Sequence, residues 1–449
     1  MRKTAAILVC FLLVSVMLAT SAVVFAGKPP KPPKRPAQPG TEYWIAGGVQ
    51  PRIYQNTLFW HVASAQEIWM WDLGVDGIPE TSDDGVKQLV ASGLPSNLGF
   101  YRVWANRLVF DAWSGEEISQ IYMIDLPDGA PYTVTEGDYL KRNPEIYGDV
   151  LVYESYPEGQ TIPEGILNFH NPGSDGIFGN EDDAVYEKLG GGVFPRIWGN
   201  RVVSRTAADL IVYELEGGAP DGGTSLGKQY AWWPAIYENT IAWEDKRSGN
   251  MDIYMQVGMG EETPIATGGK SDYQPEIYDN LIVWYEYEYK THGKGGHITD
   301  VYVHDLSTSD SYQLTNSGNG YDPDVFGNHI VYHNITKKEA GVFLFIFDSG
   351  GDGGQSAGVH PGTDGFMLFQ NSPNPVRGRT AIRFTLAESA PVTLTVHDVA
   401  GRNVATVADR EFTAGSHTVE WNPDVPSGTY FCRIQAGEFT ATKRMTVIR

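Results

Sequence analysis

The chain has 449 residues, with 33 Lys and Arg against 55 Asp and Glu, so its formal net charge is −22. A polyanion of this kind excludes nucleic acid and anionic lipid surfaces as natural partners. Apolar residues at 41%, aromatic residues at 12% and 51 glycines exclude disorder for the bulk of the chain and indicate a folded protein rich in turns. The length allows two or three domains.

The N-terminus, residues 1–26, has the pattern of a secretory signal peptide. Arg2 and Lys3 precede an apolar run over residues 4–25 that ends close to a small-residue cleavage signal. The alternative is a transmembrane anchor, since about 20 apolar residues can span a bilayer. Residues 27–40, GKPPKPPKRPAQPG, follow as a Pro/Lys-rich spacer that favours extended backbone and forms no core.

The cysteine count changes once the leader is removed. The sequence holds Cys10 and Cys432, and Cys10 lies in the leader, so the mature chain can form no internal disulfide. Its stability must therefore come from packing, with metal ions as a further source. No later stretch is long and apolar enough to span a membrane, so we expect no stable transmembrane anchor.

A ten-residue block of the form P-x-[IV]-[YWF]-x-[ND]-x-[ILV]-[VA]-aromatic recurs about every 45 residues. This period is typical of one four-stranded blade of a β-propeller. Seven copies therefore predict seven blades. The copies begin at Pro51, Tyr101, Pro144, Pro195, Pro234, Pro275 and Pro323.

Each copy is expected to form two hairpin strands, followed by a third strand and a short fourth one. The seventh copy has no fourth strand after Phe347, whereas residues 43–46 precede the first copy in the place of that missing strand. We expect them to close the ring and remove its exposed sheet edges. Aromatic residues at fixed repeat positions are assigned to the core between blades: Trp60, Phe110, Tyr153, Trp243, Trp284 and Tyr332.

The repeated blocks resemble those of TolB-like propellers over residues 41–349, and the fifth copy, with its run from Trp243 to Tyr254 (WEDKRSGNMDIY), is the most similar to the family pattern. The resemblance implies the fold. It implies little about function, because such propellers include protein-binding modules, sugar lyases and domains appended to peptidases.

The pattern changes after a Gly-rich hinge at residues 350–365. Residues 366–449 contain alternating strands separated by Gly, Pro and Asp turns, which predicts an Ig-like β-sandwich. The chain as a whole is therefore expected to be all-β, with a seven-bladed β-propeller followed by this sandwich.

The C-terminal segment resembles the Por-type C-terminal sorting domains of type IX secretion. Several separated motifs occur in the right order, and their residues include Gly401, Arg402, Gly428, Tyr430, Lys443 and Arg449. The resemblance implies recognition by an outer-membrane export machine and delivery to the cell surface or the medium. An ordinary Ig-like adhesion module is the alternative.

Two insertions between the third and fourth strands, in the first and third copies, share the form G-x-D-G-I-x4-D-D. Clustered carboxylates around a Gly turn suit a hard cation with several oxygen ligands, calcium above all. The alternative is a plain acidic hairpin. The candidate ligands are Asp76, Asp83 and Asp84 in the first loop and Asp175, Asp182 and Asp183 in the second.

The second residue of each block is expected to lie near the axial channel of the propeller. Charged side chains at this position form either ion pairs between blades or a polar ligand pocket, in which arginines would suit a carboxylate or an acidic sugar. The candidates are Arg52, Arg102, Glu145, Arg196, Glu276 and Asp324; the fifth copy has Ala235 instead.

Blade six also carries His292, His297, Asp300, His304 and Asp305, which are residue types that bind transition metals, although strand alternation separates several of them. The sequence contains no zinc-protease helix, phosphate loop or dinucleotide fingerprint, and we assign no catalytic residue.

These observations predict a non-catalytic binding protein, secreted or held at the cell surface, with a protein or glycan ligand, the export machinery as a partner and calcium as a possible bound ion. The alternative is a carbohydrate-active enzyme, a glycoside hydrolase or polysaccharide lyase, that uses Arg52, Arg102, Arg196 and Glu145 at the channel mouth. Two carboxyl groups about 5–9 Å apart in an open cleft would favour a glycosidase. Charges paired across the blades would favour binding.

Overall fold

A computed structural model describes residues 40–348, except 75, 95–97, 114–117, 128, 158–164, 174–175, 189–191, 291–295 and 336–339, and residues 367–447, except 369–375, 377–378, 387–388, 399–401, 414 and 438. The expected leader, most of the spacer and the hinge lie outside these ranges and stay predictions. Among the described residues, no helix has the length and apolar character that a membrane crossing requires.

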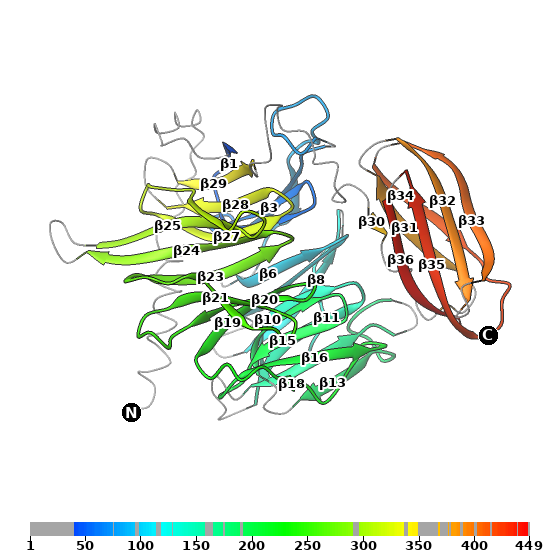
Figure 1. The fold of residues 1–449 in the computed structure, drawn as a ribbon, viewed down its shortest axis with the longest axis horizontal. Coiled ribbons are helices and arrows are strands. Elements are labelled where there is room, and N and C mark those ends of the chain that lie inside the picture. Colours follow the sequence, from blue (N-terminus) through cyan, green and yellow to red (C-terminus); the bar gives the residue numbers. More distant parts are fainter. Residues whose placement is uncertain are drawn as a thin grey trace.

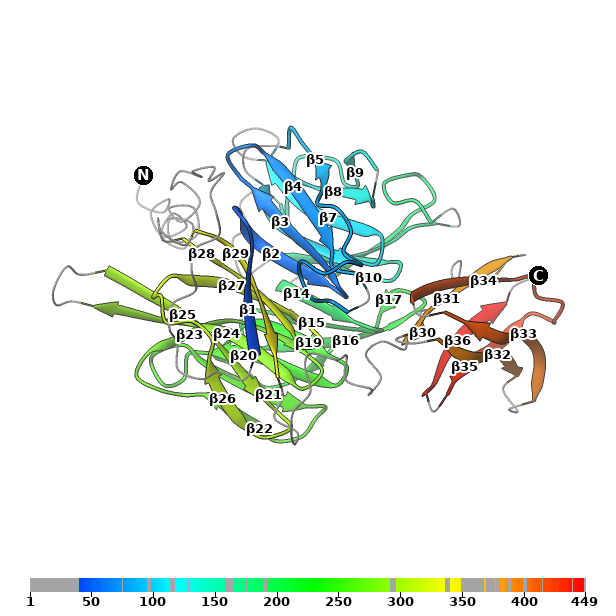
Figure 2. The same cartoon turned by 90° about the horizontal axis from the view of Figure 1, so that it is seen from above.

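Seven antiparallel sheets follow one another along the chain between residues 40 and 347 (Figures 1 and 2). The strands of each blade are given from the channel outward. Blade one has β2 (Val49–Tyr54), β3 (Thr57–Val62), β4 (Glu67–Asp72) and β5 (Gln88–Ala91), and blade two has β6 (Leu98–Trp104), β7 (Arg107–Trp113), β8 (Ser119–Asp125) and β9 (Tyr132–Thr133). Blade three has β10 (Leu140–Tyr147), β11 (Val150–Tyr156), β12 (Ile166–Asn171) and β13 (Ala184–Lys188). Blade four has β14 (Val193–Trp198), β15 (Arg201–Arg205) and β16 (Leu210–Glu216), with an outer strand split into β17 (Ala219–Pro220) and β18 (Thr224–Ser225).

Blades five to seven complete the ring. Their strands are β19 (Ala231–Tyr237), β20 (Thr240–Asp245), β21 (Asp252–Val257) and β22 (Glu262–Ala266); β23 (Ser271–Tyr278), β24 (Leu281–Lys290), β25 (Gly296–Asp305) and β26 (Asp310–Gln313); β27 (Gly320–Phe326), β28 (His329–Asn334), β29 (Gly341–Phe347) and β1 (Gly40–Ala46). The innermost strands β2, β6, β10, β14, β19, β23 and β27 contact one another in a closed cycle, which confirms the expected seven-bladed propeller.

The N-terminal strand closes the last blade. β1 pairs antiparallel with β29, with Gly40 opposite Phe347 and Ala46 opposite Val342. This pairing confirms the place expected for residues 43–46. The blade so formed contains strands from both ends of the propeller, and it covers what would otherwise be the open edge of β29.

Hydrophobic side chains fill the spaces between the blades. Phe110, Trp243, Trp284 and Tyr332 are all buried, as expected for aromatic residues at fixed positions of the repeat. Phe110 joins a cluster that also contains Phe59 of the preceding blade, so each such cluster connects two neighbouring sheets. Burial of this kind is the main stabilising contribution to the propeller.

Every innermost strand contains a bulge close to the first residue of the repeated block, which is proline in six blades and Tyr101 in blade two. The pairing with the second strand shifts there, for example between Val49 and Arg52 in blade one. In six blades the residue at the bulge has a left-handed backbone although it is not glycine. These residues are Gln50, Asn143, Phe194, Trp233, Gln274 and Asp322, with φ between 38° and 53°.

The C-terminal segment forms two further sheets. One has the order β30 (Met367–Leu368), β31 (Thr380–Leu386) and β34 (Gly415–Trp421); the other has β33 (Asn403–Phe412), β32 (Ala390–Asp398), β35 (Gly428–Ala436) and β36 (Phe439–Val447). Phe384 and Trp421 from the first sheet share one core with Leu394 and Ile434 from the second. The free thiol of Cys432 is buried in the same core, and burial raises the pKa of this thiol.

Candidate functional site

The charged residues at the second position of the repeat do gather at the propeller axis, as expected. Together with the aromatic side chains two positions later they line a cavity of about 110 Å³. We call the charged set the channel charges; it consists of Arg52, Arg102, Glu145, Arg196, Glu276 and Asp324.

Four of the channel charges form a closed network. Glu145 Oε1 accepts hydrogen bonds from Arg102 Nε and Arg196 Nη1, both at 2.6 Å. Glu276 Oε1 accepts from Arg102 Nη2 at 3.1 Å and from Arg196 Nη2 at 2.6 Å. Two cations and two anions from four different blades thus neutralise one another at the axis. Burial alone would lower the pKa of Arg102, but the two glutamates raise it above its usual value.

The remaining two channel charges are held by the backbone. Arg52 donates from Nη1 to the carbonyl oxygen of Pro51 at 2.7 Å and from Nε to that of Tyr101 at 3.3 Å. Asp324 Oδ2 accepts the N–H of Ile53 at 3.0 Å. Burial raises the pKa of Asp324, and the positive charge of Arg52 partly offsets this increase. Burial also lowers the pKa of Arg52.

A layer of seven aromatic side chains, one from each blade, lies in the channel beside the charges. Trp198 contacts Trp104 at 5.9 Å and Tyr278 at 5.7 Å between ring centroids, although these two residues belong to blades two and six. Trp198 therefore reaches across the axis. The layer consists of Tyr54, Trp104, Tyr147, Trp198, Tyr237, Tyr278 and Phe326, and its neighbouring rings touch in a complete circle.

The aromatic layer was not predicted from the sequence. The signal was present, because all seven residues occupy the fourth position of the repeated block, two residues after the channel charges. Strand alternation places residues two apart on the same side, so both sets had to face the axis together.

Buried carboxyl groups on the second strands hold the left-handed bulge residues in place. Glu154 Oε2 accepts the backbone N–H of Phe194 in the next blade at 2.9 Å, and Glu244 Oε1 accepts that of Gln274 at 2.8 Å. Asp111 Oδ1 accepts the N–H of Asn143 at 3.3 Å. Burial raises the pKa of Asp111 to about 6, of Glu154 to about 7 and of Glu244 to about 8.

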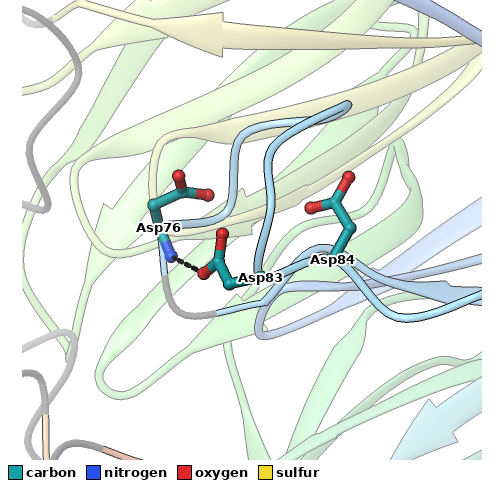
Figure 3. A group of neighbouring side chains, drawn as sticks. All are labelled: Asp76, Asp83 and Asp84. Carbon is teal, nitrogen blue, oxygen red and sulfur yellow. Dashed lines mark hydrogen bonds between the residues drawn. The ribbon is translucent and has the colours of Figure 1, made fainter.

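The first acidic loop brings its three predicted carboxylates together (Figure 3). One oxygen each of Asp76, Asp83 and Asp84 lies within 4.8 Å of the others. The hydroxyl of Thr81 lies among them, 2.7 Å from Asp83 Oδ1 and 3.3 Å from Asp76 Oδ1 and Asp84 Oδ1. Backbone N–H groups of the loop also donate to all three carboxylates, that of Asp76 to Asp83, that of Ile78 to Asp76 and those of Glu80 and Thr81 to Asp84. The cluster of carboxylate and hydroxyl oxygens fits a cation that takes several oxygen ligands.

The second acidic loop has different partners. Asp183 Oδ2 accepts the backbone N–H of Gly179 at 2.6 Å and lies 2.5 Å from Nε2 of the buried His170. The N–H of Asp182 bonds instead to Asn180 Oδ1 at 3.1 Å. Asp175, the third candidate ligand, lies outside the described residues.

The metal-type residues of blade six do not form one cluster within the described part of the chain. His304 Nδ1 pairs with the hydroxyl of Ser311 at 2.8 Å, and Asp300 Oδ1 accepts from Thr315 at 2.9 Å. His297 lies instead beside the tyrosines of the β24–β25 hairpin. His292 lies outside the described residues.

Two of the predicted sorting residues have defined contacts. Arg402 Nε donates to Asp398 Oδ2 at 2.7 Å, and the hydroxyl of Tyr430 donates to the carbonyl oxygen of Pro426 at 2.8 Å. Gly428 begins β35. Gly401, the side chain of Lys443 and Arg449 lie outside the described residues.

Residues 372–448 match the secretion system C-terminal sorting domain family. The match confirms the expected sorting domain and indicates export to the cell surface or the extracellular space. It covers the C-terminal part of the chain alone, and no curated protein matches the chain.

The chain is similar to several solved structures, one of which is described as a β-propeller domain. The β-propeller domain of the Trilobed protease from Pyrococcus furiosus is 15% identical, with 68% of this chain and 96% of that chain covered and a TM-score of 0.47. A putative TolB from Agrobacterium tumefaciens is 11% identical, with 62% and 81% covered and a TM-score of 0.34. The acylaminoacyl peptidase of Pyrococcus horikoshii is 14% identical, with 77% and 59% covered and a TM-score of 0.45. No function follows from likenesses at this level.

Proposed function

We propose that the propeller is a non-catalytic binding module that the sorting domain delivers to the cell surface or the medium. The observation that carries the proposal is the closed network of Arg102, Glu145, Arg196 and Glu276. Its charges satisfy one another across the blades, and the circle of aromatic rings fills the channel beside them. A rigid ring of this kind is a suitable support for binding surfaces on its loops and hairpins.

A carbohydrate-active enzyme is less well supported. A glycosidase needs one carboxyl group that can give up a proton and a second that faces the substrate. Glu145 and Glu276 each accept hydrogen bonds from the same two guanidinium groups through a single oxygen. Arginine does not release its proton in proteins. The third carboxyl group of the channel, that of Asp324, accepts the N–H of Ile53 and lies close enough to Arg52 to be influenced by its charge. The charged groups at the axis are therefore engaged with one another or with the backbone.

We also propose that the first acidic loop binds a calcium ion through Asp76, Asp83 and Asp84. The clustering of the three carboxylates around the hydroxyl of Thr81 supports this role. The second loop is a weaker candidate, because Asp183 Oδ2 already lies 2.5 Å from Nε2 of His170. The ion would hold the two ends of an exposed loop together, which is a structural role.

The remaining proposals concern the organisation of the chain. We propose a signal peptide over residues 1–26, a spacer over 27–40, a propeller over 41–349, a hinge over 350–365 and an Ig-like fold for residues 366–449. The two packed sheets and their shared core support the last of these.

The binding proposal is tested with the mature full-length chain on a glycan array and, in parallel, with oligosaccharide mixtures analysed for new reducing ends or unsaturated products. We expect retention of a ligand without any new product. If the wild type turns over a bound glycan and Glu145→Gln does not, the carbohydrate-active enzyme replaces the binding proposal.

A further inference from the structure

The β24–β25 hairpin of blade six is longer than the propeller requires. β24 has 10 residues, whereas the second strands of the other six blades have 5 to 7. The neighbouring strand β23 pairs only as far as Tyr287, so the hairpin continues beyond it as a ribbon of two strands. Figures 1 and 2 both show β24 and β25 extending past the adjacent blades.

Tyrosines occupy one face of the β24–β25 hairpin, both on the ribbon and on the part of β24 that still pairs with β23. In the run Tyr285-Glu286-Tyr287-Glu288-Tyr289 strand alternation separates the tyrosines from the glutamates. The pairing places His297 opposite Tyr289 and Tyr273 of β23 opposite Tyr285, on the same face. We call this set the tyrosine stripe; it consists of Tyr273, Tyr285, Tyr287, Tyr289 and His297.

The side chains of the stripe support one another. The rings of Tyr273 and Tyr285 stack at 5.7 Å between centroids. His297 contacts the rings of Tyr287 and Tyr289 at 5.3 Å and 5.2 Å, and its Nδ1 is hydrogen-bonded to the hydroxyl of Tyr287. The aromatic surface is therefore ordered before any ligand arrives, which lowers the entropic cost of binding.

The exposure of the stripe increases toward the end of the hairpin. Tyr285 and Tyr287 are half-buried, whereas Tyr289 is 59% exposed and His297 is exposed. A two-stranded ribbon with an exposed aromatic face gains little from burial in its own fold. Tyr289 and His297 at the outer end are thus available to another molecule, whereas Tyr285 at the inner end packs against the core of blades six and seven and supports the stripe from below.

The opposite face of the ribbon is different in kind. Glu286 and Glu288 lie there and pair with Lys270 at 2.5 Å and 3.5 Å. The stripe itself carries no acidic or basic side chain apart from one histidine, on a chain whose net charge is −22. An anionic partner is disfavoured by this charge.

We propose that the tyrosine stripe binds a neutral glycan chain. Sugar rings present apolar C–H faces that pack on aromatic rings, and their hydroxyl edges can bond to tyrosine hydroxyls and to imidazole. From Tyr285 to Tyr289 the stripe runs about 13 Å along one strand, which suits an extended chain. A stable protein interface buries about 800 Å² on each partner, and a stripe one side chain wide is narrow for that purpose. The inference rests on the proposed binding function and names its ligand class.

Affinity electrophoresis of the mature full-length chain tests the proposal. The gels contain xyloglucan, galactomannan or hydroxyethylcellulose, with the polyanion alginate for comparison. We expect retardation by at least one of the neutral polymers and none by alginate. Tyr289→Ala and Tyr287→Ala should weaken the retarding interaction at least tenfold, whereas Tyr289→Phe, which keeps the ring, should retain most of it.

Two variants serve as matched controls. Glu288→Gln alters the opposite face of the same ribbon, and Tyr230→Ala removes a tyrosine that is 51% exposed in another blade. Both should bind as the wild type does, and thermal melting checks that every variant folds. Absence of retardation by all three neutral polymers overturns the inference, as does retardation that Tyr289→Ala leaves intact. Capture of a protein through the stripe would overturn the glycan inference but would agree with the proposed binding function. Release of new polysaccharide chain ends would overturn the proposed non-catalytic binding function itself.

Discussion

Glu244 on β20 accepts the backbone N–H of Gln274 in the following blade at 2.8 Å, and Gln274 has a left-handed backbone with φ of 53°. A carboxyl group thus holds an unfavourable backbone conformation of its neighbour across a blade boundary. Burial raises the pKa of Glu244 to about 8.

This relationship makes the stability of the propeller depend on pH. Because the folded pKa lies above the unfolded value of about 4.3, the folded state binds more protons between these values. The stabilising contribution is complete below the unfolded pKa and is lost as the pH rises through about 8. We expect Glu244→Gln, which stays neutral and can still accept the bond, to exceed the wild type by roughly 2–4 kcal/mol in free energy of unfolding at pH 9.

Urea denaturation between pH 5 and pH 9 measures this difference. The exposed Glu261 in the same blade provides the control, and Glu261→Gln should follow the wild-type profile. If Glu244→Gln and the wild type lose stability in parallel over this range, the raised pKa of Glu244 is not the cause.

Removal of one guanidinium group from the axial network should be costly. In Arg196→Ala, Glu145 and Glu276 would share the single cation Arg102 in a buried site, which typically costs about 3–5 kcal/mol. Adding Glu276→Gln should restore part of the loss, because it removes one of the two carboxylates that share Arg102. Urea denaturation is again the measurement.

Arg201→Ala is the comparison for this experiment, because Arg201 pairs at 2.7 Å with Glu214, whose side chain is 49% exposed. Pairs of this type contribute about 0–1 kcal/mol. Equal losses in Arg196→Ala and Arg201→Ala would contradict a special role for the axial network.

Calcium should raise the melting temperature of the mature chain by a few degrees, because an ion that binds only the folded state stabilises it. The double variant Asp76→Asn, Asp83→Asn should lose the response, since the amides keep their acceptor oxygens but remove two negative charges. Asp138→Asn, at an exposed aspartate elsewhere in the propeller, should keep it. Wild-type melting curves that are the same with calcium and with a chelator would refute the site.

Deletion of residues 40–46 should destabilise the propeller and promote association, because it leaves β29 as an open sheet edge. Gly341→Val tests the same contact without shortening the chain: Gly341 has φ of 148°, and a Cβ atom there would lie 2.5 Å from the carbonyl oxygen of Ala46. Light scattering and thermal melting measure both effects. Deletion of residues 27–38 should leave stability and oligomeric state unchanged; the same behaviour in the 40–46 deletion would argue against closure by β1.

Removal of residues 366–449 should retain the propeller inside the cell envelope, since this segment contains the sorting domain match at 372–448. Fractionation of the native host with an antibody against the propeller measures the distribution. As a folding control, the melting temperature of the truncated propeller must equal that of the propeller in the full chain. Unchanged delivery to the surface or the medium would refute a role for this segment in export.

The fold could be predicted from the sequence because one block recurs seven times, so that each copy supports the strand assignment of the others. The position of the channel charges followed from the same repetition. Their ion-pair partners could not be predicted in the same way, because Arg102 is 43 residues from Glu145 and 174 residues from Glu276 in the sequence. Such pairings depend on how the ring closes.

Features that vary between blades were harder to foresee. The position of Glu244 on the second strand is occupied by Asp111 in blade two and by His61 in blade one, so no common residue type marks its role. The two acidic loops read alike in sequence. Yet Asp84 in the first loop lies close to Asp76 and Asp83, whereas Asp183 in the second loop lies beside His170. That difference comes from the strand beneath the loop.

The pairing of β1 with β29 also has a mechanical consequence. Because Gly40 lies opposite Phe347, the chain enters and leaves the propeller side by side. A pull on the C-terminal segment loads β29, which is paired on both sides, with β28 and with β1, so that two ladders of hydrogen bonds resist together. A pull on the N-terminal segment loads β1, which has one partner. A propeller that is attached through its C-terminal segment is therefore loaded at β29, the end that resists pulling more strongly.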